Sequence, residues 1–311
     1  AGGGPGPAAA AAAPGPWPSV AVLVCTFERP ALLEEALRQI AVQEYPGDVE
    51  AIVVDDSAAS FEGRLAELRA QGAALPKVQY MYLQKRETIG AKRNLAARST
   101  AADVLVVWDD DDVFTVDRLR NQVRHLEAFG GAAGVRCSGI EVHSIYSVPK
   151  QSLALRSARL PQLVFENTLC FARSWWEGNA FGFGEAWEVS GQGEGTLEPW
   201  WREVRPLTAD QEPFLYVYLP SSVSGGTALN IDPHPEPDQR MFGLVRALRD
   251  GRFPEALPGR HVRGAVRGAR AALAAMLGDE GLLSPRVSEG SSVDPAAEYA
   301  LFVEQYAPLR E

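Results

Sequence analysis

The sequence predicts an α/β protein in which helices cover a mostly parallel sheet on both faces. Short apolar runs alternate with helix-length segments over the first 130 residues, and 46% of the 311 residues are hydrophobic. Two of the apolar runs end in paired aspartates. Strands that alternate with helices form parallel sheets, and ligands of such sheets bind beyond the carboxyl ends of the strands. The polar residues at those ends are therefore the first candidates for function.

The individual elements follow from apolar runs and from spacing. Strands are predicted at residues 20–27, 49–54, 78–83 and 104–108. Helices are predicted from Pro30, which fits a first helical turn, and near residues 60–71, 90–99 and 117–129. Further along, residues 163–176 are interpreted as a core strand followed by an aromatic-rich turn.

The most informative feature is a run of four aspartates directly after the strand at 104–108. Neighbouring side chains of a strand point to opposite faces, so we expect Asp109 and Asp111 to converge while Asp110 and Asp112 point elsewhere. Two convergent carboxylates at a strand end are a natural site for Mg²⁺ or Mn²⁺, shared with a phosphate-bearing ligand. The run therefore predicts a divalent-metal site.

A second acidic strand end supports this interpretation. Asp55 and Asp56 close the strand at 49–54, and Thr26 lies at the end of the first strand. In a parallel sheet these ends share one edge with the aspartate run, so we expect the side chains to rim one site. Without a second acidic end, a solvated turn that caps the next helix would be the simpler interpretation.

Composition and charge narrow the possible partners. The formal charge of −10 argues against nucleic acid, because phosphate binding requires a basic face. No apolar run approaches the roughly 20 residues that span a bilayer, so we expect a soluble protein, with the cytoplasm slightly favoured. The three cysteines show no zinc-ligand spacing, and neither a P-loop nor a Gly-x-Ser-x-Gly motif is present.

Phosphoryl transfer is one alternative chemistry, with Asp109 as the nucleophile and Asp111 as the acid. The Asp-x-Asp-x-Val pattern superficially resembles that of the haloacid-dehalogenase-like phosphatases. Those enzymes usually carry the motif on the first strand, whereas here it follows the fourth. The position of the motif therefore disfavours this alternative.

Four motifs, in their order along the chain, resemble the family 2 glycosyltransferases of the GT-A fold. They are Val-Leu-Val-Cys-Thr-Phe-Glu-Arg-Pro, Val-Val-Asp-Asp-Ser, Ile-Gly-Ala-Lys-Arg-Asn-Leu-Ala, and Trp-Asp-Asp-Asp-Asp followed by Asp-Arg-Leu. The resemblance covers about residues 19–130. It implies inverting transfer from a nucleotide-diphosphate sugar, with UDP as the commonest nucleotide, to an acceptor hydroxyl, assisted by Mn²⁺ or Mg²⁺. The Gln-x-x-Arg-Trp signature of processive synthases is absent, so we expect a single sugar to be transferred to a carbohydrate, lipid or protein acceptor.

The resemblance also implies a nucleotide site at the ends of the first two strands. Thr26 and the backbone around Phe27 would border the base. Asp55 or Asp56, the latter being the weaker choice, would accept hydrogen bonds from the base or the ribose.

Further residues would serve the diphosphate. Lys92 and Arg93 would contact the base or the diphosphate, where a helix N-terminus favours anions; a solvated basic turn is the alternative. Asp109 would reach the ribose or a metal-bound water, and Asp111 would ligate the metal that bridges the phosphates.

The resemblance places the catalytic base and the acceptor in the second half. Glu194 matches an acidic position of related enzymes, but Gly195 replaces the aspartate that usually follows it. Glu194 is our choice of general base, and the substitutes are Glu188 and Glu198. Trp175 and Trp176 could stack on a sugar ring, although paired aromatics are more often core material.

These assignments divide the chain into three consecutive parts. We expect an Ala/Gly/Pro-rich disordered segment at 1–18, a GT-A domain at 19–240 and a C-terminal helical extension at 241–311. The domain would join a Rossmann-like nucleotide-sugar half (19–130) to an acceptor half (131–240). The departure at Gly195 also keeps a second function class open, namely a catalytically inactive binding or scaffold domain.

Overall fold

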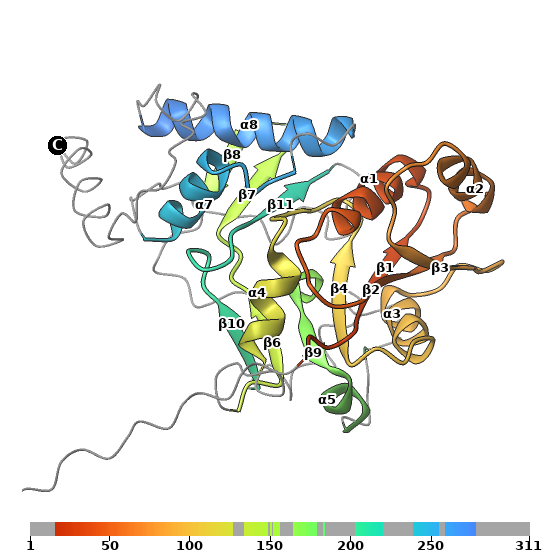
Figure 1. Cartoon of the computed structure of the whole chain (residues 1–311). Coiled ribbons are helices and arrows are strands. Elements are labelled where there is room, and N and C mark those ends of the chain that lie inside the picture. The colour runs from red at the N-terminus through yellow and green to blue at the C-terminus, as the bar shows by residue number, and fades with distance from the viewer. Residues whose placement is uncertain are drawn as a thin grey trace, which may run out of the picture.

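The structure, a computed structural model, describes residues 16–126, 134–148, 150, 152–155, 164–178, 183, 203–219, 239–254 and 259–277. The first half consists of alternating strands and helices (Figure 1). In chain order they are β1 (Val20–Thr26), α1 (Pro30–Ala41), β2 (Val49–Asp55), α2 (Glu62–Ala70), β3 (Lys77–Tyr82), α3 (Ile89–Arg98), β4 (Val104–Asp109), β5 (Val113–Phe114) and α4 (Arg118–His125). Every strand and helix predicted in this half is present, and the predicted bounds differ from these by at most four residues. Only the short β5 was not predicted.

The second half has short strands and ends in two helices. Its elements are β6 (Cys137–Ile140), β7 (Ser144–Ser147), β8 (Ser152–Leu155), the 3₁₀ helix η2 (Glu166–Thr168), β9 (Cys170–Ala172), α5 (Arg173–Gly178), β10 (Val204–Leu207), β11 (Phe214–Tyr218), α7 (Gln239–Arg249) and α8 (Arg260–Leu277).

The prediction of a strand followed by a turn at 163–176 was wrong in detail. The strand β9 is only three residues long, η2 precedes it and α5 follows it. The Thr168 hydroxyl donates to the Phe165 carbonyl at 2.7 Å, a local bond of the kind that competes with strand pairing.

Two sheets organise these elements. The larger has seven strands in the order β10-β6-β9-β4-β1-β2-β3, and the smaller has four in the order β5-β11-β7-β8. Strands β3, β2, β1 and β4 are parallel neighbours, which confirms the mostly parallel sheet. Strand β9 runs antiparallel to both β4 and β6.

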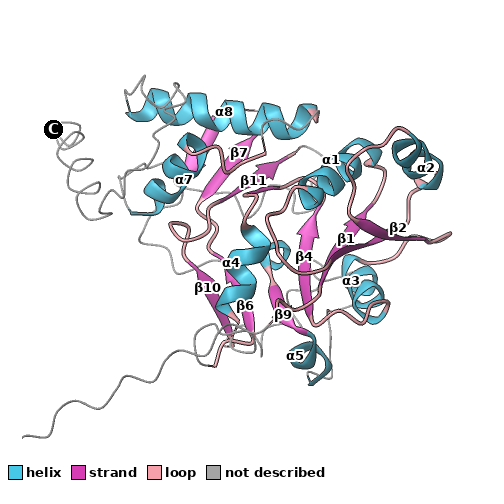
Figure 2. Cartoon of the chain, viewed as in Figure 1, coloured by secondary structure: helices cyan, strands magenta, loops and turns pink. Residues whose placement is uncertain are grey.

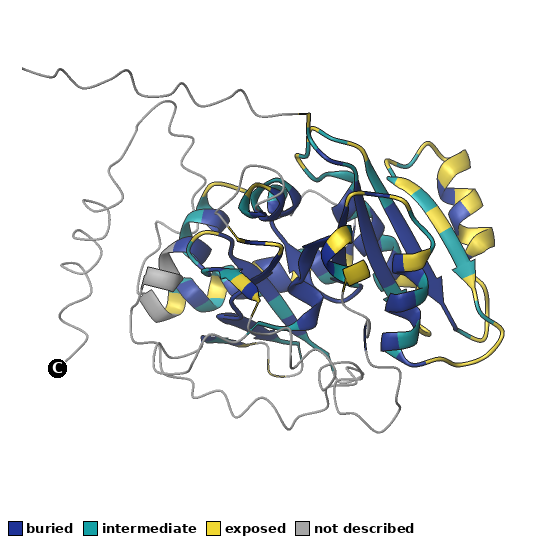
Figure 3. Cartoon of the chain, turned by 90° about the horizontal axis from the view of Figure 1, so that it is seen from below, coloured by how far each residue is buried: buried dark blue, intermediate teal, exposed yellow. Residues whose placement is uncertain are grey.

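Helices cover both faces of the larger sheet (Figure 2). Val22 of β1 belongs to a core with residues of α1, α2 and α4, whereas the next residue, Leu23, belongs to a core with residues of α3 and α5. Figure 3 shows the strands buried between these layers and the outer side of α2 exposed. The parallel strands therefore end together at one edge, where Asp55 closes β2 and Asp109 closes β4.

The helices α7 and α8 pack on the smaller sheet. Leu244 of α7 and Val266 of α8 share a core with Leu215 of β11. A Cβ atom at Gly268 would lie 2.2 Å from the Tyr146 hydroxyl oxygen, so a glycine allows α8 to approach β7 closely. No helix in the described ranges is both long enough and apolar enough to cross a membrane. The proposed boundary near residue 240 stays a prediction.

A buried carboxyl group connects α4 with the turn before β11. Glu212 is fully buried and accepts hydrogen bonds from the Thr115 hydroxyl, the Asn121 amide (2.6 Å) and Arg252 (3.4 Å). Burial raises the pKa of Glu212 to about 7, although these donors oppose the shift. The folded protein therefore holds the Glu212 proton more tightly than the unfolded chain does.

Glu212→Gln is expected to flatten the pH dependence of stability between about pH 4.5 and 7. A carboxyl whose pKa is raised on folding contributes stability that is complete below the unfolded pKa and is lost as the pH rises through the folded pKa. At about 1.4 kcal/mol per pKa unit, the raised pKa of Glu212 contributes at most about 3 kcal/mol to the free energy of unfolding. Urea unfolding at several pH values measures it, with the exposed Glu62→Gln as control. An unchanged pH profile in Glu212→Gln would contradict this assignment.

Candidate active site

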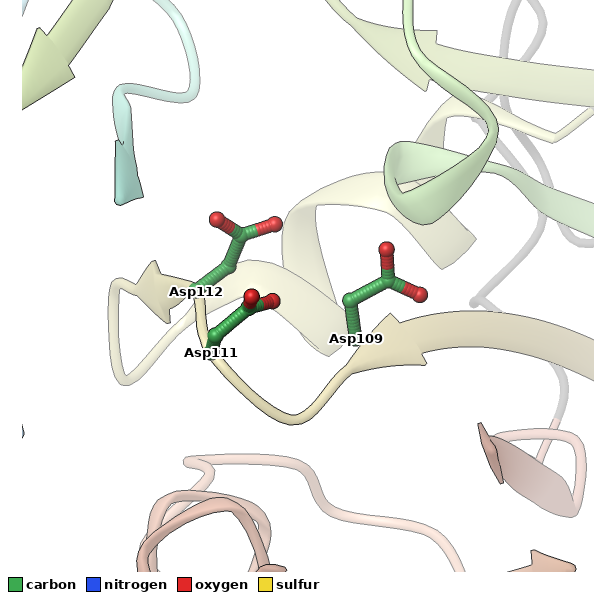
Figure 4. A group of neighbouring side chains, drawn as sticks. All are labelled: Asp109, Asp111 and Asp112. Carbon is green, nitrogen blue, oxygen red and sulfur yellow. The ribbon is translucent and has the colours of Figure 1, made fainter. Parts of the chain in front are cut away.

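The aspartate run lies where β4 ends, with Asp109 as the last strand residue and the others on the turn before β5 (Figure 4). Among the described residues, Asp109, Asp111 and Asp112 each offer one oxygen, and these atoms lie within 4.8 Å of one another. The expected convergence of Asp109 and Asp111 is present. The expectation that Asp112 points elsewhere was wrong, because the chain turns at residues 110–111 and strand alternation ends there.

Asp110 instead points back to the end of β1. Its Oδ2 accepts a hydrogen bond from the Thr26 hydroxyl at 2.7 Å, and its Oδ1 lies 3.2 Å from Arg29 Nη1. The same arginine nitrogen lies 2.8 Å from Asp111 Oδ2. We did not single out Arg29 from the sequence, although its position just after β1 was a usable signal.

Burial and mutual repulsion raise the pKa values of the three aspartates on the turn. Burial is the largest cause, and a neighbouring aspartate adds to it in each case. The pKa of Asp110 rises to about 7, that of Asp111 rises and that of Asp112 rises well above its usual range, although Arg29 opposes the first two shifts. A cation among these oxygens would relieve the repulsion. An all-carboxylate donor set fits a hard divalent ion such as Mg²⁺ or Mn²⁺.

Asp112 also connects the run to the second half of the chain. Its Oδ1 accepts from the Val217 backbone N–H of β11 at 3.0 Å, and its Oδ2 accepts from the Asn167 amide of η2. The Asp112 side chain is fully buried. Through these two hydrogen bonds in the protein interior, Asp112 fixes the position of the turn.

Asp112→Ala is expected to lower the free energy of unfolding by about 2–4 kcal/mol. The change leaves the Val217 N–H and the Asn167 amide buried without this acceptor, and each such loss typically costs about 1–3 kcal/mol. Urea unfolding gives the value. Asp112→Asn, which keeps a carbonyl acceptor, should lose less, and the exposed Asp48→Ala should lose almost nothing. Equal stability of wild type and Asp112→Ala would contradict the positioning role.

Asp56 is surrounded by cationic donors. Both of its oxygens lie 2.7 Å from Arg86 Nη1, Oδ1 also accepts from Lys92 Nζ at 2.7 Å, and Oδ2 accepts from the Glu87 N–H at 2.8 Å. Burial alone would raise the pKa of Asp56, but these bonds lower it. Lys92 Nζ also donates to the Thr26 carbonyl at 2.9 Å, so it joins the ends of β1 and β2.

Asp55 and Phe27 complete this end of the sheet. Asp55 accepts from the backbone N–H (2.9 Å) and hydroxyl of Ser57 and from the Tyr80 hydroxyl (2.7 Å). Phe27 is 37% exposed as a residue, and the Arg86 guanidinium lies 3.5 Å from the centre of its ring. The four hydrogen bonds to Asp56 occupy its acceptor sites, whereas the three to Asp55 leave room for one more hydrogen bond.

Arg93 bridges the aspartate run to η2. Its Nη2 lies 3.0 Å from Asp109 Oδ1, and its Nη1 donates to Glu166. Burial would lower the pKa of Arg93, but the two carboxylates raise it above its usual value. Both Lys92 and Arg93 are at most 3% exposed, so the alternative of a solvated basic turn was wrong. Sequence reasoning did not single out Glu166.

The tryptophans of α5 are not brought to this edge. The residue before α5, Ala172, pairs with Val104, the first residue of β4, so α5 begins at the opposite end of that strand from Asp109. Trp175 is 5% exposed, and its indole N–H donates to Glu203 at 2.7 Å. The suggestion that Trp175 and Trp176 stack on a sugar therefore has no support, and Trp175 is core material.

The proposed base lies outside the described residues, as do its substitutes. Glu194 and Gly195, with Glu188 and Glu198, fall in the range 184–202. Another residue that sequence reasoning missed is described: His261 Nε2, at the start of α8, lies 2.7 Å from the Asp111 carbonyl oxygen.

Comparisons with known proteins agree with this geometry. Residues 21–173 match the family model described as glycosyl transferase family 2. An N-acetylglucosaminyltransferase from Bradyrhizobium elkanii is 32% identical over 110 residues, which cover 35% of this chain and 60% of that protein. The matched part thus spans less than two thirds of the relative's length.

Solved structures of S. aureus TarS residues 1–349 share the fold. The complex with UDP-GlcNAc has a TM-score of 0.51 and 14% identity, covering 93% of this chain and 80% of that one. The complex with UDP has a TM-score of 0.50 and 14% identity, covering 84% and 92%. The family match leaves the haloacid-dehalogenase-like alternative without support. Residues 21–173 therefore form a domain of glycosyl transferase family 2, and the fold is of the GT-A type.

Proposed function

We propose that this protein is a metal-assisted, inverting glycosyltransferase that moves a single sugar from a UDP-sugar to an acceptor hydroxyl. The observation that carries the proposal is the group of carboxylate oxygens from Asp109, Asp111 and Asp112 within 4.8 Å at the carboxyl end of β4. The buried cations Lys92 and Arg93 lie at the same edge. Carboxylates for a metal and cations for a diphosphate are the groups that the leaving nucleotide needs in such a transfer.

The leaving group requires charge compensation. Negative charge builds on the nucleoside diphosphate as the bond to the sugar breaks, and a divalent ion bound by Asp109 and Asp111 would neutralise part of it. Arg93 holds the Asp109 carboxylate in place, while Arg29 holds that of Asp111. These ion pairs orient both carboxylates before a ligand arrives.

The nucleotide would bind across the ends of β1 and β2. Thr26 and Phe27 would border the base, and Asp55 or Asp56 would face the base or ribose. The partial exposure of Phe27 at this edge of the sheet supports this placement, with the Arg86 guanidinium covering one face of its ring. Lys92 lies in the first turn of α3, where the helix N-terminus favours the diphosphate.

The acceptor hydroxyl must lose a proton as it attacks. Glu194 is the proposed general base, on the strength of its match to the acidic position of related enzymes. TarS has been solved with UDP-GlcNAc, and the Bradyrhizobium relative is an N-acetylglucosaminyltransferase. UDP-GlcNAc is therefore the first donor to test, and the acceptor is still to be identified.

A thermal-shift titration tests the proposal. UDP and UDP-GlcNAc are added with Mn²⁺, with Mg²⁺ or with EDTA, and the metal-containing samples should unfold at higher temperature. A ligand at 100 times its dissociation constant adds about 2.7 kcal/mol of stability. Slow release of UDP from UDP-GlcNAc would support the enzyme. Tight binding of UDP-GlcNAc with no release of UDP, whichever acceptor is added, would support the inactive scaffold domain. Absence of any metal-dependent nucleotide binding would overturn both the metal site and the proposed function.

A further inference from the structure

The C-terminal helix α8 begins beside the aspartate run, although 150 residues separate the two in sequence. His261 Nε2 lies 2.7 Å from the carbonyl oxygen of Asp111. A carbonyl oxygen can only accept, so Nε2 carries the proton and donates it. The bond therefore holds the backbone of Asp111, whose side chain supplies one of the three clustered carboxylate oxygens.

The start of α8 is itself held in place by α1. The Glu35 carboxylate accepts from the backbone N–H of His261 at 3.0 Å and from that of Val262 at 2.8 Å. A carboxylate at a helix N-terminus satisfies free N–H groups and favours the helix dipole. A Cβ atom at Gly259 would lie 2.4 Å from Glu35 Cδ, so a glycine lets the carboxylate approach.

The rest of α8 is anchored as well. Val262, Val266 and Leu273 are fully buried against the smaller sheet, where Gly268 sits against Tyr146. The helix is 18 residues long and runs from α1 over the smaller sheet (Figure 1). The His261 imidazole therefore lies on a helix that is fixed by α1 at its start and by the smaller sheet along its length.

Asp111 needs such support because it lies on the turn between β4 and β5, outside both strands. Arg29 holds its carboxylate, and His261 holds its peptide carbonyl. Metal ligands must be held close to one binding geometry, and residues that orient a ligand residue by hydrogen bonds contribute to metal affinity.

We propose that α8 is a working part of this site and that His261 is a positioning residue, which sets the orientation of Asp111 through its backbone. The inference rests on the proposed function, since it takes Asp111 to be a metal ligand. It assigns a role to the extension beyond residue 240, which lies outside the family match at 21–173.

The test compares His261→Ala, His261→Gln and Arg267→Ala. Glutamine can place an amide N–H near the position of the imidazole Nε2, and Arg267 lies on the exposed side of the same helix. Calorimetry measures the apparent affinity for Mn²⁺ in the presence of UDP, and separately the affinity for UDP in EDTA. Urea unfolding reports on the fold.

His261→Ala is expected to weaken the apparent Mn²⁺ affinity by about 10-fold or more, the usual loss when a residue behind a ligand is removed. UDP binding in EDTA should stay unchanged, which separates positioning from a general loss of structure. His261→Gln should recover most of the affinity, and Arg267→Ala should match wild type. If His261→Ala does not fold, His261→Asn, which is too short to reach the carbonyl, takes its place.

Two results would overturn the inference: wild-type Mn²⁺ affinity in His261→Ala, or no recovery in a well-folded His261→Gln. A wild-type protein that binds UDP without any metal dependence would instead refute the proposed metal site. The failure of the positioning role and the failure of the function are thus distinguishable.

Discussion

Asp111→Ala is expected to abolish metal-dependent nucleotide binding and to reduce sugar transfer by about 10²–10³-fold or more, the loss seen when one charge-stabilising group is removed. The Asp111 carboxylate is one of the three that place oxygens within 4.8 Å of one another, and Arg29 orients it. Removing it leaves a divalent ion with too few ligands at the end of β4. Calorimetry with UDP and Mn²⁺ measures the binding, and UDP release measures the transfer.

Stability provides the internal control for this variant. Burial and the charge of Asp109 raise the pKa of Asp111, so its ionised form is unfavourable in the folded protein. Asp111→Asn should therefore be at least as stable as wild type at neutral pH, and it should still lose the metal. A loss of binding caused by unfolding would show as a lower urea midpoint. Retained Mn²⁺-dependent UDP binding in both variants would refute the metal site.

Glu194→Gln is expected to leave UDP and Mn²⁺ binding intact while it slows transfer by about 10²–10⁴-fold, the usual contribution of a general base. Glutamine keeps the size and hydrogen-bonding capacity of the side chain but cannot take the proton of the acceptor hydroxyl. Transfer rates at saturating donor, combined with calorimetry of UDP and Mn²⁺, separate the two effects.

The neighbouring acids serve as matched controls for the base. Glu188→Gln and Glu198→Gln make the same chemical change close by in the sequence, and both should retain near wild-type rates. A fully active Glu194→Gln would show that the base assignment is wrong. A loss confined to one of the other two variants would then move the assignment to that residue.

The first half of the fold could be predicted because local sequence and final structure agree there. Strand β4 is a run of apolar residues that is buried on both faces, and α1 begins at a proline that suits its first turn. Each element is decided by side chains within the same segment. The parallel arrangement then follows from the alternation of strands with helices.

Errors began where a short segment depends on distant partners. Asp112 turns inward because the β11 backbone and Asn167 offer donors there, and neither is near it in sequence. The three-residue strand β9 lies antiparallel between β4 and β6, a placement that its own few residues do not specify. Trp175 and Trp176 had the right chemistry for a sugar platform, but α5 lies at the other end of β4.

The sequence alone determined the order of strands and helices in the first half apart from β5, the acidic strand ends and the resemblance to the family, because these depend on patterns within short segments. Only the tertiary structure decided which polar groups bond to one another: Arg29 with Asp110 and Asp111, Arg93 with Glu166, and His261 with the Asp111 backbone. The physical reason is that hydrogen bonds and ion pairs act over a few ångströms in space. Residues as far apart in the chain as Glu35 and Val262, 227 positions, become partners only when packing brings them together.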